Sequence, residues 1–422
     1  MTQPVAEGER IASLDVLRGF ALLGILLLNI LGFGLLSNAI FFPDPETSSG
    51  LDTGVWGGIE LAAEGAMRAL FSMLFGAGVL LLATGPRAKS AAVFFKRHFW
   101  LLMFGVLDMF VLLWLGDILI VYALAGMLLF FVRNASARRL LIGAAVLMVL
   151  MSSCNGVMGF GLNMSRQAAE QVTNSPTPQE LPTEVRQSAE GWQEFAGDYY
   201  MDEAARAEEL QARSGSYLSA FAWNYEQSVE SLLFVLPTIL IWDALLMMLL
   251  GMALYKMGVM QGERSRSFYW RLMLGGFAVG LSLNAYEVAQ AFRTNFDLLA
   301  SFPYFKFTYH LGRCGMALGY VGALVLLVQS GALQSLLTRL SAVGRMALTN
   351  YLMHSVIGLF VFTGAGLGLV GELTRFQLYG VVLAIWVFQL WFSPWWLARY
   401  HFGPLEWVWR WLTYGSAPPL AR

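Results

Sequence analysis

The stretch from Arg10 to Leu36 constrains the fold of this chain more than any other segment. From Leu14 onward it is apolar for more than twenty residues, and a helix rising ~1.5 Å per residue then spans a bilayer core of ~30 Å. Three polar residues, Asp15, Arg18 and Asn29, fall within about 60° of one another on that helix. Ionisable side chains in such a segment cost several kcal/mol unless paired, so this stripe is expected to face other helices or a water-filled cavity.

Composition extends this reading to the whole chain of 422 residues. Because 57% of the residues are hydrophobic and only 13% are charged, we predict an all-α, polytopic membrane protein. Cys154 and Cys314 lie in apolar runs, which excludes a disulfide framework and a cysteine metal site, and we predict no metal. A phosphate loop, HExxH and GxSxG are missing, and no nucleic-acid partner is expected.

Apolar runs bounded by charges or turn residues predict about ten spans. A five-helix half over 1–160 is followed by an extracytoplasmic loop over 161–229, a second five-helix half over 230–398 and an interfacial tail over 399–422. The predicted spans are 14–36, 66–84, 97–115, 117–133, 139–160, 230–257, 268–291, 307–329, 344–363 and 377–398.

The distribution of lysine and arginine predicts the orientation of these spans. Eighteen of the 27 basic residues, Arg10 and Arg87 among them, lie in segments on the same side as the N-terminus. Positive charge accumulates on the cytoplasmic side, so both termini are predicted to be cytoplasmic. The segment 37–65, acidic through residues such as Glu46, and the loop 161–229 are then outside.

One run within the long loop, from Glu184 to Arg213, has helical spacing. Its aromatic residues, Trp192 and Phe195 among them, predict an amphipathic helix that lies on the outer membrane face. This helix would either cap the spans or cover a substrate.

Several polar residues inside the predicted spans are candidates for chemistry. A carboxylate in lipid must be protonated, paired or hydrated, and Arg313 is the natural partner for Asp108 or Asp117. His310 shares a helical face with Arg313 and is our first choice for a general base, since its titration range suits that role. The alternative for His310 is an interfacial packing residue, and Asp243 is a further carboxylate within a span.

Two further stripes of polar residues complete the candidate set. The run GRMALTNYLMHS places Asn350, Tyr351 and His354 along the ninth span, with Arg345 at its start. Arg68 begins the second span. Together with Asp15 and Arg18, these residues are the candidates for binding a substrate or cofactor. The alternatives are an inner-face anchor for Arg345, hydrogen bonds between helices for Asn29, and a local pair between Asp15 and Arg18.

Five motifs resemble those of the YeiB-like family, whose C-terminal part is a domain of unknown function. They are RIASLDVLRGFALLGILLLN, MRALFSMLFGAG, GDILIVYALAGML, VGRMALTNYLMHS and GPLEWVWRWLTYG, in that order along nearly the whole chain. The resemblance implies a multi-pass inner-membrane protein of bacteria.

The first motif is also distantly similar to membrane-bound acyltransferases of the heparan glucosaminide acetyltransferase type. Those proteins pass an acyl group from coenzyme A on one side of the membrane to a sugar on the other. The similarity implies that Arg18 lies near the donor entrance and Asn29 near the acyl path. The catalytic histidine that those relatives place after the first span is missing, since residues 30–65 contain no histidine.

Three hypotheses follow for function. The leading one is an acyltransferase that moves an acyl group from cytoplasmic acyl-coenzyme A to a small-molecule, glycan or lipid acceptor outside. His310 would be the base, Asn29 an oxyanion donor and Arg313 an orienting residue, with Arg18 and Arg345 on the donor phosphates. The second is a secondary transporter or lipid-handling permease, and the third a membrane scaffold. A homo-oligomer is compatible with each.

Overall fold

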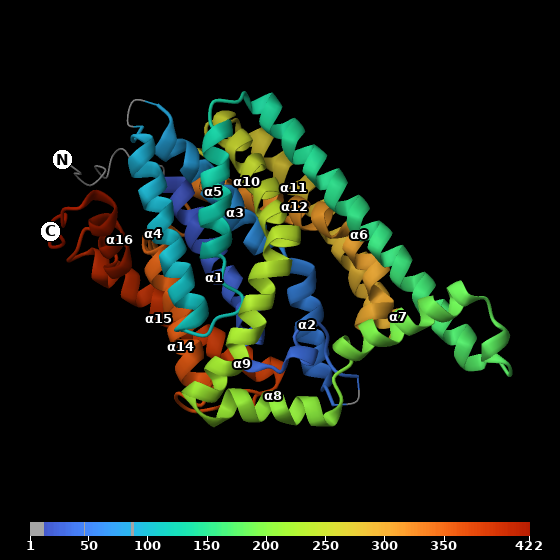
Figure 1. The fold of residues 1–422 in the computed structure, drawn as a ribbon. Helices are drawn as coiled ribbons and strands as arrows, with labels where there is room; N and C mark the ends of the chain where they lie inside the picture. Colours follow the sequence, from blue (N-terminus) through green and yellow to red (C-terminus); the bar gives the residue numbers. More distant parts are fainter. Residues whose placement is uncertain (1–11, 46, 86–87) are drawn as a thin grey trace.

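The computed structural model describes residues 12–45, 47–85 and 88–422, and this part of the chain is built from helices (Figure 1). Arg10, Glu46 and Arg87, which entered the predictions above, lie outside the described residues. The helices are α1 (Ala12–Gly34), η2 (Ser37–Ala39), α2 (Gly50–Ala62), α3 (Ala66–Ala83), α4 (Ala91–Phe110), α5 (Leu119–Val132), α6 (Ala137–Asn174), η3 (Pro178–Glu180), α7 (Thr183–Tyr199), α8 (Glu203–Gly215), α9 (Tyr217–Glu230), the π-helix η4 (Ser231–Leu240), α10 (Ile241–Lys256), α11 (Arg266–Arg293), α12 (Leu298–Ser330), α13 (Gln334–Arg345), α14 (Ala347–Phe362), α15 (Arg375–Leu397) and α16 (Pro404–Tyr414).

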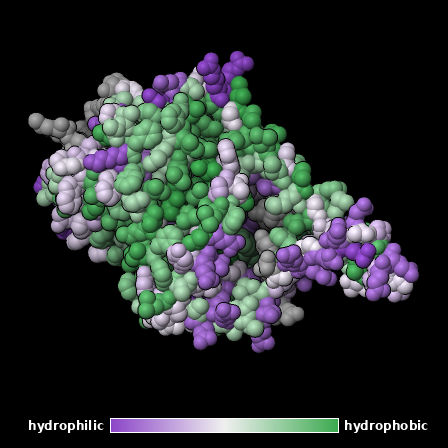
Figure 2. All heavy atoms as spheres, in the orientation of Figure 1, coloured by the Kyte–Doolittle hydropathy of each residue, from purple (hydrophilic) through white to green (hydrophobic). Residues whose placement is uncertain are grey.

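Long apolar helices confirm the predicted class of all-α, polytopic membrane protein. Seven helical segments of the described chain are long and apolar enough to cross a membrane, and α5 and α14 are shorter apolar helices. With α4, which carries Lys96, Arg97 and Asp108, they account for the ten predicted spans. Apolar residues cover the middle of the surface in Figure 2, and hydrophilic ones gather along its lower edge and on the α6–α7 arm.

The structure differs from the predicted boundaries where helices continue past the apolar runs. The loop predicted over 161–229 contains the end of α6, all of α7 and α8, and α9, which runs through η4 into α10 without interruption. The single amphipathic helix predicted over 184–213 is two helices, α7 and α8, separated near Asp202. In Figure 1, α8 lies across the bottom of the molecule, and α6 and α7 form an arm on the right.

Two other boundaries shift for local reasons. The segment 37–65 contains α2, which is separated from α3 only by a break at Gly65, where φ is +62°. The predicted span 344–363 begins with the end of α13 and is interrupted at Met346 before α14. Apolar content predicted the membrane segments, but it carries no signal for a polar helix or for a break within an apolar one.

Helix α1 occupies the centre of the bundle and packs against α3, α13, α14 and α15. Its crossing with α13 is close because both helices have glycine there. A Cβ on Gly19 would collide with the carbonyl of Leu340, and a Cβ on Gly344 would collide with the carbonyl of Asp15. We call the end of the bundle where α8 lies the α8 side, and the end where α1 begins and α16 packs the α16 side.

Candidate functional site

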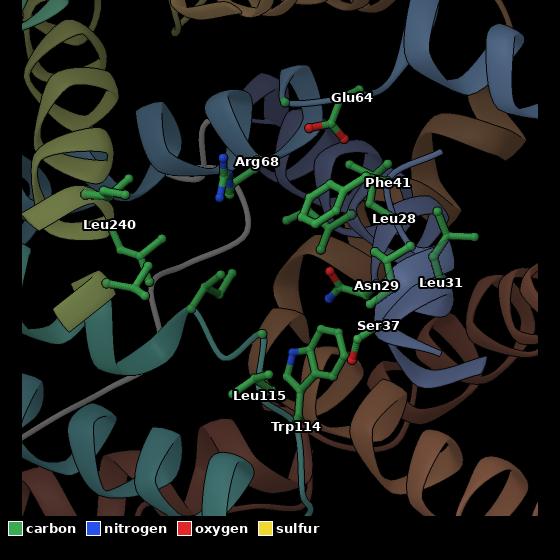
Figure 3. A pocket seen from close by; sticks show the side chains of 18 of the residues that line it. Leu28, Asn29, Leu31, Ser37, Phe41, Glu64, Arg68, Trp114, Leu115 and Leu240 are labelled. Carbon is green, nitrogen blue, oxygen red and sulfur yellow. The ribbon is translucent and has the colours of Figure 1, made fainter. Parts of the chain in front are cut away.

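A large cavity occupies the half of the bundle toward the α8 side (Figure 3). Its volume is about 1250 Å³, and most of its walls are apolar side chains of α1, α6, η4 and the connection over 111–118. Asn29, near the end of α1, directs its amide into this space, and Arg68 of α3 faces it from another wall. A cavity of this size with a few polar groups is typical of a ligand-binding site.

Two walls of the cavity, α6 and η4, are poorly covered by other helices. Helix α6 packs mainly against α10, α12 and α7, and few of its side chains are buried. None of the residues in η4 is buried, although Val235, Ile239 and Leu240 line the cavity. Figure 2 shows the surface hollowed between this helix and the α6–α7 arm. The cavity therefore opens sideways, toward the space that lipid would fill.

A buried ion pair lies at the inner end of the cavity. Both terminal guanidinium nitrogens of Arg313 donate to the carboxylate of Asp243, with Nη1 at 2.9 Å from Oδ2. Arg68 approaches the same carboxylate to 3.6 Å. Arg313 is 1% exposed and Asp243 is 7% exposed, so the pair avoids the cost of an isolated buried charge only because the two groups meet.

His310 belongs to this cluster, and its hydrogen bonds define its tautomer. Nη2 of Arg313 lies 2.8 Å from Nδ1 of His310. A guanidinium can only donate, so Nδ1 accepts and the ring proton lies on Nε2. Nε2 is 3.3 Å from the side-chain amide nitrogen of Asn155. Because Nε2 carries the proton, it donates to this amide only when the oxygen and nitrogen of Asn155 are exchanged. In this arrangement His310 offers a proton instead of accepting one.

Arg68 connects the buried pair to the cavity surface. Its Nη2 donates to the hydroxyl of Tyr309 at 3.0 Å, and that hydroxyl donates to Glu64 at 3.2 Å. The Arg68 side chain is 36% exposed, and Figure 3 places Arg68 and Glu64 near one another at the cavity wall. Arg68 is therefore the cation of the cluster that a ligand reaches first.

The prediction that Arg313 pairs with Asp108 or Asp117 is wrong. Asp117 instead accepts the backbone N–H of Ile120 at 2.8 Å, at the start of α5. Asp108 lies beside Asp117 in a second buried cluster, with the hydroxyl of Tyr351 nearby. Both carboxylates belong to the α4–α5 pair, whereas Arg313 on α12 faces α3 and α10.

The residues predicted along the ninth span join helices and do not line the cavity. The Asn350 amide donates to Ser393 at 3.0 Å, and Nε2 of His354 lies 3.1 Å from the side-chain oxygen of Gln389. Tyr351 accepts from the indole of Trp114 at 3.2 Å. These contacts hold α14 to α15 and to the 111–118 connection. Hydrogen bonds between helices therefore account for this stripe.

The first-span stripe is divided between the two ends of the bundle. Arg18 donates to Asp15 at 2.9 Å, as the local pair predicts, and this pair lies toward the α16 side. Arg345, at the end of α13, is also on that side. Of the candidate residues, Asn29, Arg68 and His310 line the cavity together.

Sequence reasoning missed two members of the site. Asp243 was noted but not paired with Arg313, although it is the one carboxylate between 231 and 262. Asn155, an amide within the apolar run of α6, is not among the predicted site residues. No group of three or more histidine, cysteine or carboxylate residues suited to a metal occurs in the described part of the chain.

Comparison with known proteins finds one family model and three relatives. Residues 254–416 match the family model described as "Protein of unknown function (DUF418)". The Bacillus subtilis protein YxaH is 29% identical over 440 aligned residues, covering 100% of this chain and 98% of the relative. Escherichia coli YeiB is 29% identical over 413, covering 97% and 98%. No solved structure matched.

The fold and the cavity thus define a helical, polytopic membrane protein with a buried ionic site. Within that class, the chain is similar to YeiB and YxaH over nearly its whole length and matches DUF418 over residues 254–416, which supports the predicted resemblance to the YeiB-like family.

Proposed function

We propose that this protein is a lipid-handling membrane protein that takes up an amphiphilic molecule in the cavity on the α8 side. The observation that carries the proposal is the combination of apolar walls, a sideways opening and one charged end. An acyl chain would bury apolar surface along α6 and η4, worth about 25 cal/mol per Å². The polar head would meet Arg68 through a charge-assisted hydrogen bond.

The π-helix at the opening supports this proposal. Runs of π-helix are rare and occur frequently at functional sites. Here η4 contains Pro237, and the backbone of α9–η4–α10 is continuous around it.

Lipid retained on purification tests the proposal. The full-length protein is purified in mild detergent, and bound lipid is extracted and measured by mass spectrometry. Arg68→Gln should reduce the retained amphiphile about tenfold, the equivalent of about 1.4 kcal/mol. Arg271→Gln, which removes an exposed arginine bonded to its own helix at Ser267, is the matched control. Equal retention by wild type and Arg68→Gln would contradict the proposal.

An assay in sealed vesicles distinguishes transport of the amphiphile from binding alone. A fluorescent phospholipid moves between the leaflets of reconstituted vesicles if the cavity serves a permease, and Arg68→Gln should slow that movement. No coenzyme A is required. Retention without movement would restrict the function to binding.

Acyl transfer is a second candidate, because Asn29 and His310 line one cavity. The acceptor oxygen would attack the thioester carbonyl of acyl-coenzyme A, its proton would pass to a base, and the thiolate of coenzyme A would leave. His310 would serve as that base only after Nδ1 is released by Arg313. The lipid-handling proposal requires no such rearrangement, so the geometry favours it.

Melting temperature with acetyl-coenzyme A distinguishes these candidates. A ligand at about 100 times its dissociation constant stabilises a protein by about 2.7 kcal/mol. Under acyl transfer the wild type shows that shift and Arg18→Ala does not. If the melting temperature does not shift, acetyl-coenzyme A is excluded as the donor. The scaffold hypothesis further expects that no small molecule stabilises the protein.

A further inference from the structure

The wall of the cavity formed by α2 and α3 carries charges of both signs. Glu60, Glu64 and Arg68 follow one another at intervals of four residues, and all three line the cavity. The side chains of all three are half-buried, so they are partly accessible. A head group that reaches Arg68 therefore meets carboxylates on the same wall as well as the guanidinium.

Glu64 and Arg68 are joined through one neutral group. The Tyr309 hydroxyl accepts from Nη2 of Arg68 at 3.0 Å and donates to Oε1 of Glu64 at 3.2 Å. The two charged groups are therefore no further apart than two hydrogen bonds, and Figure 3 shows both at the cavity wall. Glu64 forms no salt bridge in the described structure. A positive group on a ligand would thus supply the charged partner that this carboxylate lacks.

Gly65 allows this arrangement of Glu64 and Arg68 around Tyr309. Its φ is +62°, a backbone conformation that glycine adopts without strain. A Cβ at this position would lie 2.8 Å from the Tyr309 hydroxyl and 3.0 Å from Cδ of Arg313. The break between α2 and α3 therefore lets α12 bring Tyr309 against the segment that carries both charged residues.

The position of Glu64 affects which head groups fit beside Arg68. A phosphate bound to Arg68 also lies near the Glu64 carboxylate, and like charges close together in a site disfavour binding. Asp243, the other carboxylate near Arg68, is paired with Arg313. An ammonium group joined to the phosphate by a two-carbon link would place a positive charge within reach of Glu64. A phosphate head without a cationic group leaves the repulsion uncompensated.

We propose that the cavity selects a zwitterionic phospholipid whose head group carries a phosphate and a primary ammonium, as phosphatidylethanolamine does. The phosphate binds Arg68, and the ammonium donates to Glu64 through charge-assisted hydrogen bonds, with Glu60 further along the same wall. A primary ammonium has N–H groups for a carboxylate, whereas a quaternary one has none. This inference rests on the function proposed above and names the class of amphiphile.

Competition between two phospholipids measures the preference. The full-length protein in detergent is incubated with equal amounts of phosphatidylethanolamine and phosphatidylglycerol that have identical acyl chains, and the lipid retained after repurification is measured by mass spectrometry. We expect the wild type to retain about tenfold more phosphatidylethanolamine, the effect of one charge-assisted hydrogen bond. Glu64→Gln, which can still accept from Tyr309, should retain the two lipids about equally. Glu372→Gln, at an exposed position outside the cavity, should keep the wild-type ratio.

A modified lipid tests the same contact without a protein variant. N-acetylated phosphatidylethanolamine has the phosphate but no positive charge, so the wild type should retain it no better than phosphatidylglycerol. Equal retention of phosphatidylethanolamine and phosphatidylglycerol by the wild type would overturn the head-group assignment, as would a preference that persists in Glu64→Gln or after acetylation. Retention that still depends on Arg68 would in those cases leave the proposed function standing. Retention of neither phospholipid would overturn both.

Discussion

At the scale of single residues, the contact between Asp243 and Arg313 has the clearest energetic consequence. Asp243 faces two arginines, Arg313 and Arg68. Removing one partner of a buried pair typically costs about 3–5 kcal/mol, because the other charge remains buried. The two halves of this pair are not equivalent. Loss of Arg313 leaves Asp243 beside Arg68, whereas loss of Asp243 removes the carboxylate that pairs with Arg313 in the described structure.

We therefore expect Asp243→Asn to destabilise the protein more than Arg313→Gln does. The double variant Asp243→Leu/Arg313→Met should recover part of the loss, because it buries no charge. Unfolding free energies of the single and double variants, measured in detergent, test this. Strict additivity of the two single changes would contradict a direct pair.

The sequence does not predict which residues on different helices pair with one another. The apolar run around Arg313 predicts that this residue needs a carboxylate, and spacing along one helix predicts that Asp15 meets Arg18. Partners on separate helices depend on how those helices pack, and apolar periodicity does not determine the packing. For that reason Asp108 was as plausible a partner for Arg313 as Asp243.

At the scale of elements, polar side chains of one helix close the ends of another. Arg213 of α8 donates to the carbonyls of Gly32, Phe33 and Leu35 at distances of 2.8–3.0 Å. The last carbonyls of a helix have no partner within it. Helix α8 therefore serves as the cap of α1, which explains why a polar helix lies against an otherwise apolar bundle.

Arg213→Ala should lower the unfolding free energy by about 2–4 kcal/mol, since it removes several charge-assisted hydrogen bonds. Arg206→Ala, an exposed arginine of the same helix, should change it little. Hydrogen exchange at the end of α1 measures the local effect. Equal protection in the two variants would show that α8 is not the cap.

Glu406 has the corresponding role at the start of α14, where it receives two backbone N–H groups. Glu406→Ala should lower the unfolding free energy by about 1–3 kcal/mol. It should also loosen α16, which faster proteolysis of the C-terminal tail would detect. Glu372→Ala, at an exposed position, is the control. An unchanged digestion rate in Glu406→Ala would count against an anchoring role.

At the scale of the whole molecule, the cavity makes one cysteine accessible and leaves the other enclosed. Cys154 on α6 is exposed and lines the cavity, whereas Cys314 on α12 is buried. A water-soluble, thiol-specific reagent should therefore modify Cys154 alone in vesicles, and Cys154→Ser should abolish labelling. An amphiphile that occupies the cavity should slow the reaction. Labelling of Cys314 at a similar rate would contradict the enclosed position of α12.

Composition and apolar length were sufficient to predict the membrane class and nearly every spanning helix. They were insufficient for the cavity. Its walls combine α1, η4 and α6, and only the packing shows that much of the α6 surface is left uncovered by other helices. Asn29 was found because an amide is conspicuous in an apolar run. Asn155 has the same signature and could have been found in the same way.

The capping of α1 by Arg213 also has a consequence for biosynthesis. Arg213 follows Phe33 by 180 residues, so the ribosome delivers the first span long before the residue that closes its end. During that interval the final carbonyls of α1 must be satisfied by water or by the insertion machinery. Completion of the first helix thus waits until half of the protein has been translated, and a nascent chain that stalls before α8 would retain an unfinished first span.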